Sequence, residues 1–331
     1  MNRRDVLALL SGTALTSPRL APAQEPPRIP RIGVMMGSSP AIEAERFGAF
    51  RVALERLGYV EGRTILIEPR YGESQPDRFS IIAREMVERR PTVIVCVGSQ
   101  EAAALQAATR TIPIVFTQAG SPVELGLVAS FARPGGNITG FTQMSGELDS
   151  KRLELLHEIA PSVSRVIVLL GWIEPRLMPV VQKRFADVET TAKVLGIALQ
   201  RVDAATPAEL SAALASGAAS STEALLVQND PLFATERPRI IDFAVAHRLP
   251  TVFGQKLAVA QGGLVGYGPD LIENARLAAG YVDKILKGAK PGELPVQQPT
   301  KFELVINLKT AKVLGLTVPH SIRQRADEAI E

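Results

Sequence analysis

The feature that most constrains the fold is an alternation of short apolar runs with longer helical stretches from residue 31 onward. Some runs are apolar throughout, such as VIVCV at 93–97 and VIVLL at 166–170, as strands covered on both faces require. Short strands joined by helices imply parallel sheets with right-handed crossovers. The predicted strands fall at residues 32–36, 64–71, 93–97, 112–117, 138–142, 166–170, 198–202, 224–228, 251–253, 264–267 and 302–307.

The strands form two series of about five, and a chain of 331 residues is long enough for two lobes with separate cores. We therefore predict an α/β fold of two doubly wound parallel-sheet lobes. No long linker separates the series, so the joints should be strand-like crossings that permit hinge closure. The predicted helices fall at residues 43–57, 78–89, 100–109, 151–159, 176–195, 207–216, 238–247 and 272–286.

The N-terminus has the pattern of a secretory signal peptide over residues 1–23. Arg3 and Arg4 precede an apolar run at 6–15, and the small-residue sequence Ala-Pro-Ala follows at 21–23. The run of ten residues is too short to span a bilayer core of roughly 30 Å. We predict export to the periplasm, with the general and twin-arginine routes both open.

Charge and cysteine content exclude several classes of protein. Residues 1–23 hold three of the 37 basic and one of the 34 acidic residues, which leaves 34 basic and 33 acidic residues and a net charge of +1. This balance, without a basic run, argues against nucleic acid as a partner. The single Cys96 lies in an apolar strand, so neither an internal disulfide nor a cysteine-ligated metal site is expected.

Ligands of open α/β sheets bind beyond the carboxyl ends of the strands. The loops predicted there are rich in Gly, Ser, Asn and Gln, whose small or polar groups suit close contact with a ligand. The candidate ligand-binding residues are Ser38, Ser39, Ser99, Gln100, Thr117, Gly120, Ser121, Trp172, Asn229, Asp230, Phe253 and Tyr267.

Several candidates have a structural alternative. Ser121 fits the first position of a helix capping box, and Asp230 fits a helix cap as well as a partner for a ligand ammonium. Trp172 fits a residue that covers the core of a lobe as well as one that stacks on a ligand. Phe253 fits a buried core position better than a contact with the ligand. Tyr267 lies between two glycines in a predicted hinge strand.

Motifs for catalysis are missing from the sequence. His157, His247 and His320 are far apart, and no nucleophile elbow, zinc-spaced histidine pair, phosphate loop or dinucleotide-binding glycine motif occurs. We therefore predict that the chain is not an enzyme and needs no cofactor or metal.

The sequence resembles the bacterial ABC-transporter substrate-binding proteins related to the tryptophan/tyrosine-binding type. The likeness covers nearly the whole mature chain. The motifs that carry it are LGYVEGRT at 57–64, ATRTIPIVF at 108–116, ARPGGNITG at 132–140, KRLELL at 151–156, GGLVGYG at 262–268, AGYVDKILKG at 279–288, LPVQQPTKFELVIN at 294–307, LGL at 314–316 and ADE at 326–328.

The resemblance implies a periplasmic binding fold with three crossings, which binds a small organic solute and delivers it to membrane permease subunits. We expect residues 28–140 with 268–290 in one lobe, residues 141–267 with 291–331 in the other, and a monomer. The solute would be an aromatic or amino-acid-like compound. Where many relatives carry Asp-Pro-Val, this chain has Ser121-Pro122-Val123, and the missing carboxylate weakens the expectation of an amino acid.

Two rival hypotheses remain. An enzyme with a similar doubly wound fold would need a cluster of catalytic groups in the cleft. The effector domain of a transcription regulator would need a DNA-binding motif before the first strand, where the signal peptide lies. The sequence favours the solute-binding protein over both.

Overall fold

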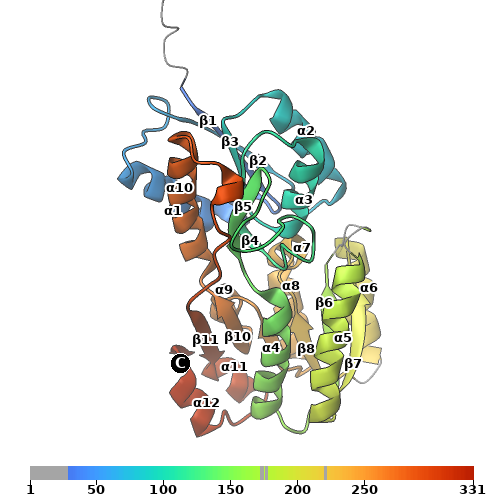
Figure 1. The fold of residues 1–331 in the computed structure, drawn as a ribbon. Helices are drawn as coiled ribbons and strands as arrows, with labels where there is room; N and C mark the ends of the chain where they lie inside the picture. Colours follow the sequence, from blue (N-terminus) through green and yellow to red (C-terminus); the bar gives the residue numbers. More distant parts are fainter. Residues whose placement is uncertain (1–28, 172–174, 176–177, 220–221) are drawn as a thin grey trace, which may run out of the picture.

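The computed structural model describes residues 29–171, 175, 178–219 and 222–331, which form two α/β lobes stacked end to end (Figure 1). The predicted signal peptide lies outside the described residues. Within these ranges, no helix combines the length and the apolar character needed to cross a membrane.

The first lobe contains a five-stranded sheet in the order β2-β1-β3-β4-β5, in which every neighbouring pair is parallel. Most of its strand residues are apolar and fully buried, because helices cover both faces. The strands are β1 (Arg31–Met36), β2 (Leu66–Tyr71), β3 (Val93–Cys96), β4 (Ile114–Ala119) and β5 (Ile138–Thr142).

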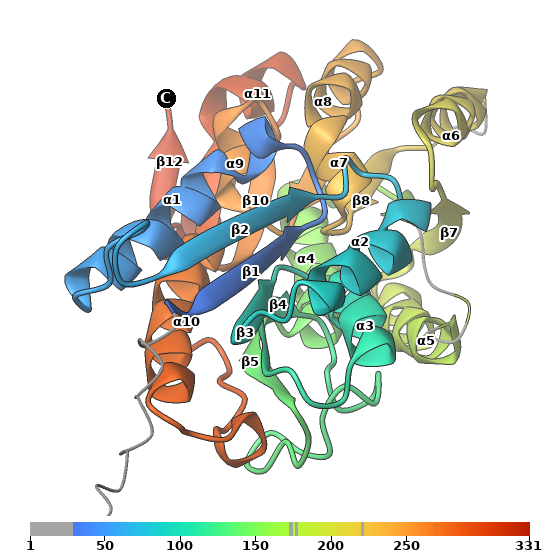
Figure 2. The same ribbon diagram turned by 90° about the horizontal axis from the view of Figure 1, so that it is seen from above.

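Four helices cover this sheet: α1 (Pro40–Arg56), α2 (Asp77–Glu88), α3 (Ser99–Ala108) and α10 (Leu271–Leu286). One face packs against α1 and α10, which lie side by side (Figure 2), and the other packs against α2 and α3. Helix α10 follows β5 by more than a hundred residues, so the chain returns to the first lobe after it has built much of the second.

The second lobe contains a seven-stranded sheet in the order β12-β11-β10-β9-β8-β6-β7. We predicted parallel strands only, but β10 and β11 pair antiparallel. The reason is that β10 leads into the first lobe and β11 returns from it, so the two run in opposite directions. The strands are β6 (Arg165–Leu170), β7 (Ala198–Asp203), β8 (Ala224–Val227), β9 (Thr251–Phe253), β10 (Val265–Pro269), β11 (Phe302–Asn307) and β12 (Glu328–Ile330).

Helices cover both faces of the second sheet, and two buried clusters form its core. Helices α4, α5, α11 and α12 border one cluster, and α6, α7, α8 and α9 border the other. The helices are α4 (Ser145–Ile159), α5 (Met178–Leu195), α6 (Pro207–Ala219), α7 (Pro231–Thr235), α8 (Arg237–Ala246), α9 (Lys256–Ala260), α11 (Leu308–Val313) and α12 (His320–Arg325).

The chain crosses between the lobes three times: after β5, after β10 and before β11. The first and third crossings pair with each other, because the Gln297 amide donates to the Gly140 carbonyl at 2.9 Å and the Thr142 amide donates to the Gln297 carbonyl at 2.9 Å. Val296 donates to the Phe131 carbonyl of the first lobe at 2.7 Å. We therefore place the third crossing after residue 297 rather than at 290.

Candidate functional site

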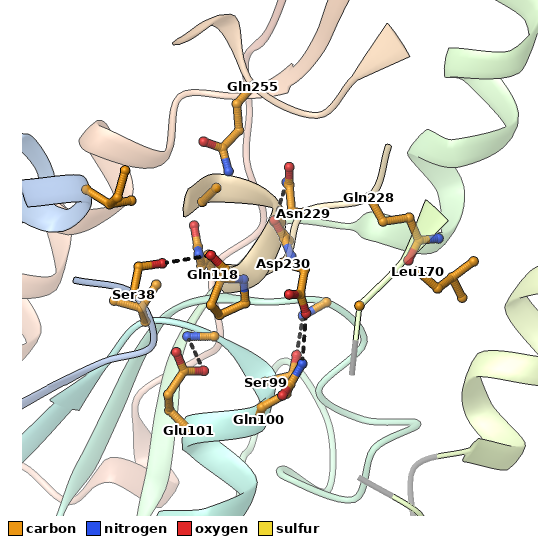
Figure 3. Close-up of a pocket in the computed structure, with 18 of the residues that line it drawn as sticks. Ser38, Ser99, Gln100, Glu101, Gln118, Leu170, Gln228, Asn229, Asp230 and Gln255 are labelled. Atoms are coloured by element: carbon orange, nitrogen blue, oxygen red, sulfur yellow. Dashed lines mark hydrogen bonds between the residues drawn. The ribbon is translucent and has the colours of Figure 1, made fainter. Parts of the chain in front are cut away.

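A cavity of about 150 Å³ lies between the two lobes. It is bordered by the loops after β1, β3 and β4 of the first lobe and after β6, β8 and β9 of the second, together with residues of α1, α4, α5 and α8. This is the position where open α/β sheets bind ligands. Figure 3 shows polar side chains of both lobes converging on this space.

Two ion-pair groups lie in the cavity wall. On α1 the Arg46 guanidinium contacts the buried Glu43 carboxylate at 2.5 Å. On α4 the buried Asp149 carboxylate accepts from Arg152 at 2.7 Å and lies 3.5 Å from Arg184 of α5. These pairs hold the arginines in fixed positions around the cavity, since charged groups with low exposure need partners.

Arg237 of α8 adds a fourth guanidinium to the lining. It donates to the Gln261 side chain at 3.1 Å, and within the described residues no carboxylate pairs with it. Burial lowers the pKa of Arg237, and the nearby charge of Arg46 lowers it further. An acceptor group of a ligand would therefore be favoured at this end of the cavity.

Two other carboxylates line the cavity without an ion pair in the described ranges: Glu101 on α3 and Asp230 before α7. Burial raises the pKa of Glu101 from 4.5 to about 7, although the Gly98 amide donates to it at 3.1 Å. Burial likewise raises the pKa of Asp230 from 3.8 to about 7, against hydrogen bonds from Leu232 and Gln100. Both groups thus hold a proton at higher pH than an exposed carboxyl group does.

Three polar atoms of the lining are buried without a hydrogen-bond partner: Gln118 Oε1, Arg46 Nε and Arg184 Nε. Buried polar atoms in proteins nearly always have a partner, which can be a ligand. Residues of the lining therefore hold one acceptor and two donors that no protein group satisfies.

The structure brings half of the predicted site residues together. The candidates that line the cavity are Ser38, Ser99, Gln100, Gly120, Asn229 and Asp230. Ser99 also accepts from the Gly120 amide at 2.8 Å, and Asn229 donates to Gln143 Oε1 at 2.9 Å. These contacts fix the strand-end loops of both lobes.

The other predicted residues have different places. Thr117 is buried and faces the Val97 carbonyl, and Phe253 is in the core of the second lobe. Ser39 precedes α1, Ser121 lies one residue beyond the lining, and Tyr267 packs at the core of the second lobe while its carbonyl accepts from Arg152. Trp172 lies outside the described residues.

Of the charged residues of the lining, the sequence analysis predicted only Asp230 and missed the others. Glu43, Arg46, Glu101, Asp149, Arg152, Arg184 and Arg237 all belong to helices. A single charged residue in a predicted helix is usually interpreted as exposed to solvent. Among these residues, only Glu101 could have been found from the sequence. Gly98 and Ser99 precede it and place it in the first turn of a helix that starts at the end of a strand.

Direct hydrogen bonds also join the two lobes beside the cavity. Ser74 of the first lobe lies 2.9 Å from the Pro231 carbonyl and 2.9 Å from the Thr235 hydroxyl of α7. Ser38 donates to the same carbonyl at 3.3 Å. Glu73 and Ser74 have φ angles of 54° and 56°, a conformation that non-glycine residues rarely adopt. We call Ser74, Pro231 and Thr235 the latch.

Ser74→Ala should shift the ligand-free protein toward an open form. The lost hydrogen bonds stabilise the closed form by about 0.5–1.5 kcal/mol, so the ratio of closed to open molecules should fall about two- to ten-fold. Small-angle scattering of the ligand-free protein would report a larger radius of gyration. Ser130→Ala, which removes a bond to Arg133 within the first lobe, should leave the radius unchanged. Equal radii for all three proteins would contradict the role of the latch.

Two lobes hinged by three crossings over a shared cavity define the class of periplasmic-binding-protein-like solute receptors. Residues 32–330 match the family model described as ABC transporter substrate binding protein. The chain belongs to this family, and its function is to bind a small organic solute for an ABC transporter.

Individual relatives agree with the family. A tyrosine-binding protein of Clostridioides difficile (strain R20291) is 27% identical over 277 residues, which are 84% of this chain and 78% of that protein. A conserved domain protein of Vibrio cholerae has a TM-score of 0.82 at 29% identity, with 91% of this chain and all of that one covered. An ABC domain from Streptococcus pneumonia in complex with L-Trp has a TM-score of 0.82 at 22% identity, with 91% of this chain and 99% of that one covered.

Proposed function

We propose that the protein is an exported, monomeric receptor that closes its lobes over one small solute in the interlobe cavity. It would pass that solute unchanged to permease subunits at the membrane. The observation that carries the proposal is the cavity itself, which is lined from both lobes and contains three buried polar atoms without partners. Residues 1–23 would direct export to the periplasm, by either secretion route.

The size of the cavity limits the solute. An engineered cavity of about 150 Å³ in another protein binds benzene, so a compound of about six to ten non-hydrogen atoms fits here. Charged and amide side chains make up about half of the lining residues, and no aromatic side chain contributes to the lining in the described part of the chain. A small polar solute therefore suits the cavity better than a large aromatic one.

A role without chemical change agrees with the composition of the lining. His157, His247 and His320 do not line the cavity, and no group of three His, Cys, Asp or Glu in the described ranges is placed to hold a metal ion. Glu101 and Asp230 have a pKa suited to a general acid, but the cavity lining in the described ranges includes no cysteine, histidine or lysine. We propose binding, rather than turnover, as the function.

Filling the cavity should abolish binding while the lobes stay folded. Ser99→Phe and Asn229→Phe place a ring where the solute would lie, so we expect affinity to fall ten-fold or more. The probe is the solute released from purified protein and identified by native mass spectrometry, and binding is measured by calorimetry. Thr190→Phe, on the exposed face of α5, is the matched control. Unchanged affinity in both cavity variants, or conversion of the solute into a product, would refute the proposal.

A further inference from the structure

Glu101 and Asp230 approach the cavity from different lobes. Glu101 lies in the first turn of α3 and is 2% exposed, and Asp230 ends the loop after β8. Gln100 Nε2 of the first lobe donates to Asp230 Oδ2 at 3.2 Å, so the two loops meet between the lobes (Figure 3). Both carboxylates therefore border the same interlobe cavity.

The pair differs from the other acids of the cavity. Glu43 and Asp149 have arginine partners, whereas across the described ranges no Lys or Arg forms an ion pair with Glu101 or Asp230. Buried carboxylates without a cation are unfavourable when ionised. The raised pKa of each carboxyl group reflects this cost of ionisation. A cation on a bound solute would stabilise the ionised carboxylates.

A third acceptor lies on the first lobe. Gln118 Oε1 is buried in the lining and accepts no hydrogen bond. An ammonium group carries three N–H donors and no acceptor, so it can serve two carboxylates and one amide oxygen together. Because the described residues offer no set of three metal-type ligands, an organic cation suits this arrangement better than a metal ion.

We propose that Glu101 and Asp230, which face the cavity from opposite lobes, together bind an ammonium group of the transported solute. The proposal rests on the receptor function proposed above and specifies its solute. Arg46 and Arg184 line the same cavity, and the Nε atom of each is a buried donor without a partner, so hydroxyl or carboxylate oxygens on the same solute would complement them.

The test uses four-carbon solutes that differ in their polar groups. The ammonium set is 4-aminobutyrate, L-2-aminobutyrate and 4-aminobutan-1-ol, and the matched set is butyrate, succinate and 1,4-butanediol. Titration calorimetry at pH 7 in two buffers with different ionisation enthalpies gives affinity and proton exchange. At least one ammonium compound should bind at least ten-fold more tightly than its matched partners. Its binding should release protons, because the bound cation favours the ionised form of both carboxylates.

Glu101→Gln and Asp230→Asn keep the shape and capping ability of each side chain while removing its charge. Each should lower the affinity for the ammonium compound ten-fold or more and reduce the proton release. Glu154→Gln, which removes an exposed carboxylate on α4, should change neither quantity. Circular dichroism confirms that each variant is folded.

Three outcomes would overturn the proposal: tighter binding of ammonium-free solutes, wild-type affinity in both variants, or no binding by the ammonium set. Small-angle scattering separates this failure from failure of the receptor function. If succinate or butanediol compacts the protein, the receptor stands with another specificity. If no solute of either set compacts it, both proposals fail.

Discussion

Asp149→Asn should lower the free energy of unfolding by about 3–5 kcal/mol, the usual result when one partner of a buried ion pair is removed. The Asp149 carboxylate accepts from Arg152 at 2.7 Å and from Gln228 Nε2 at 2.7 Å. Its loss leaves two guanidinium groups, those of Arg152 and Arg184, without their counter-charge. Since Arg152 Nε also donates to the Tyr267 carbonyl at 2.8 Å, the damage extends from α4 to β10, next to the second crossing.

Urea unfolding followed by circular dichroism would measure this loss. The matched control is Glu154→Gln on the same helix, because the exposed Lys151–Glu154 pair contributes at most about 1 kcal/mol. A loss below about 1 kcal/mol for Asp149→Asn would show that the arginines find other partners, and that the ion-pair group does not stabilise the hinge region.

Glu101→Gln should make the ligand-free protein more stable at pH 8, by on the order of 2–3 kcal/mol. The pKa of Glu101 rises from 4.5 to about 7 on folding, so the folded protein holds a proton that the unfolded chain loses. Stability from this group is therefore full below about pH 4.5 and is lost as the pH rises through 7. The variant, which does not ionise, keeps its stability over that range.

The surroundings of Glu101 support the sign of this effect. Glu43 of α1, Asp230 before α7 and the buried Cys96 thiol of β3 are its acidic neighbours. The cations of the same cavity are engaged elsewhere, Arg46 with Glu43 and Arg237 with Gln261. Thermal unfolding at pH 4.5 to 8 should show wild type and variant converging at low pH. Parallel curves at a constant separation would contradict the prediction.

Much of the fold could be predicted from the sequence, because a strand buried on both faces is apolar throughout. Each predicted strand overlaps a strand of the structure, from β1 to β11. The strand β12 was missed, since Glu328–Ile330 is short and its first residue is charged. The antiparallel direction of β11 was missed because direction depends on the route of the chain between lobes, which local composition does not record.

The site could be predicted only in part. The loop at Ser99 could be predicted because ligands of α/β sheets bind at the carboxyl ends of the strands. That rule does not tell which side chain of a loop points into the cavity. Phe253 and Tyr267 occupy the right strands yet pack into the second lobe. Glu101 was missed although it lines the cavity, because it is buried next to Glu43 and Asp230, which are distant from it in the sequence.

The latch has a consequence for transport. Its hydrogen bonds join the two lobes directly, through residues of the protein alone, so we expect part of the unloaded population to adopt the same closed shape as the loaded receptor. Such empty receptors compete with loaded ones for the same membrane complex. Uptake should then rise with receptor abundance only to a maximum and decline beyond it, and loosening the contact at Ser74 should shift that maximum to higher abundance.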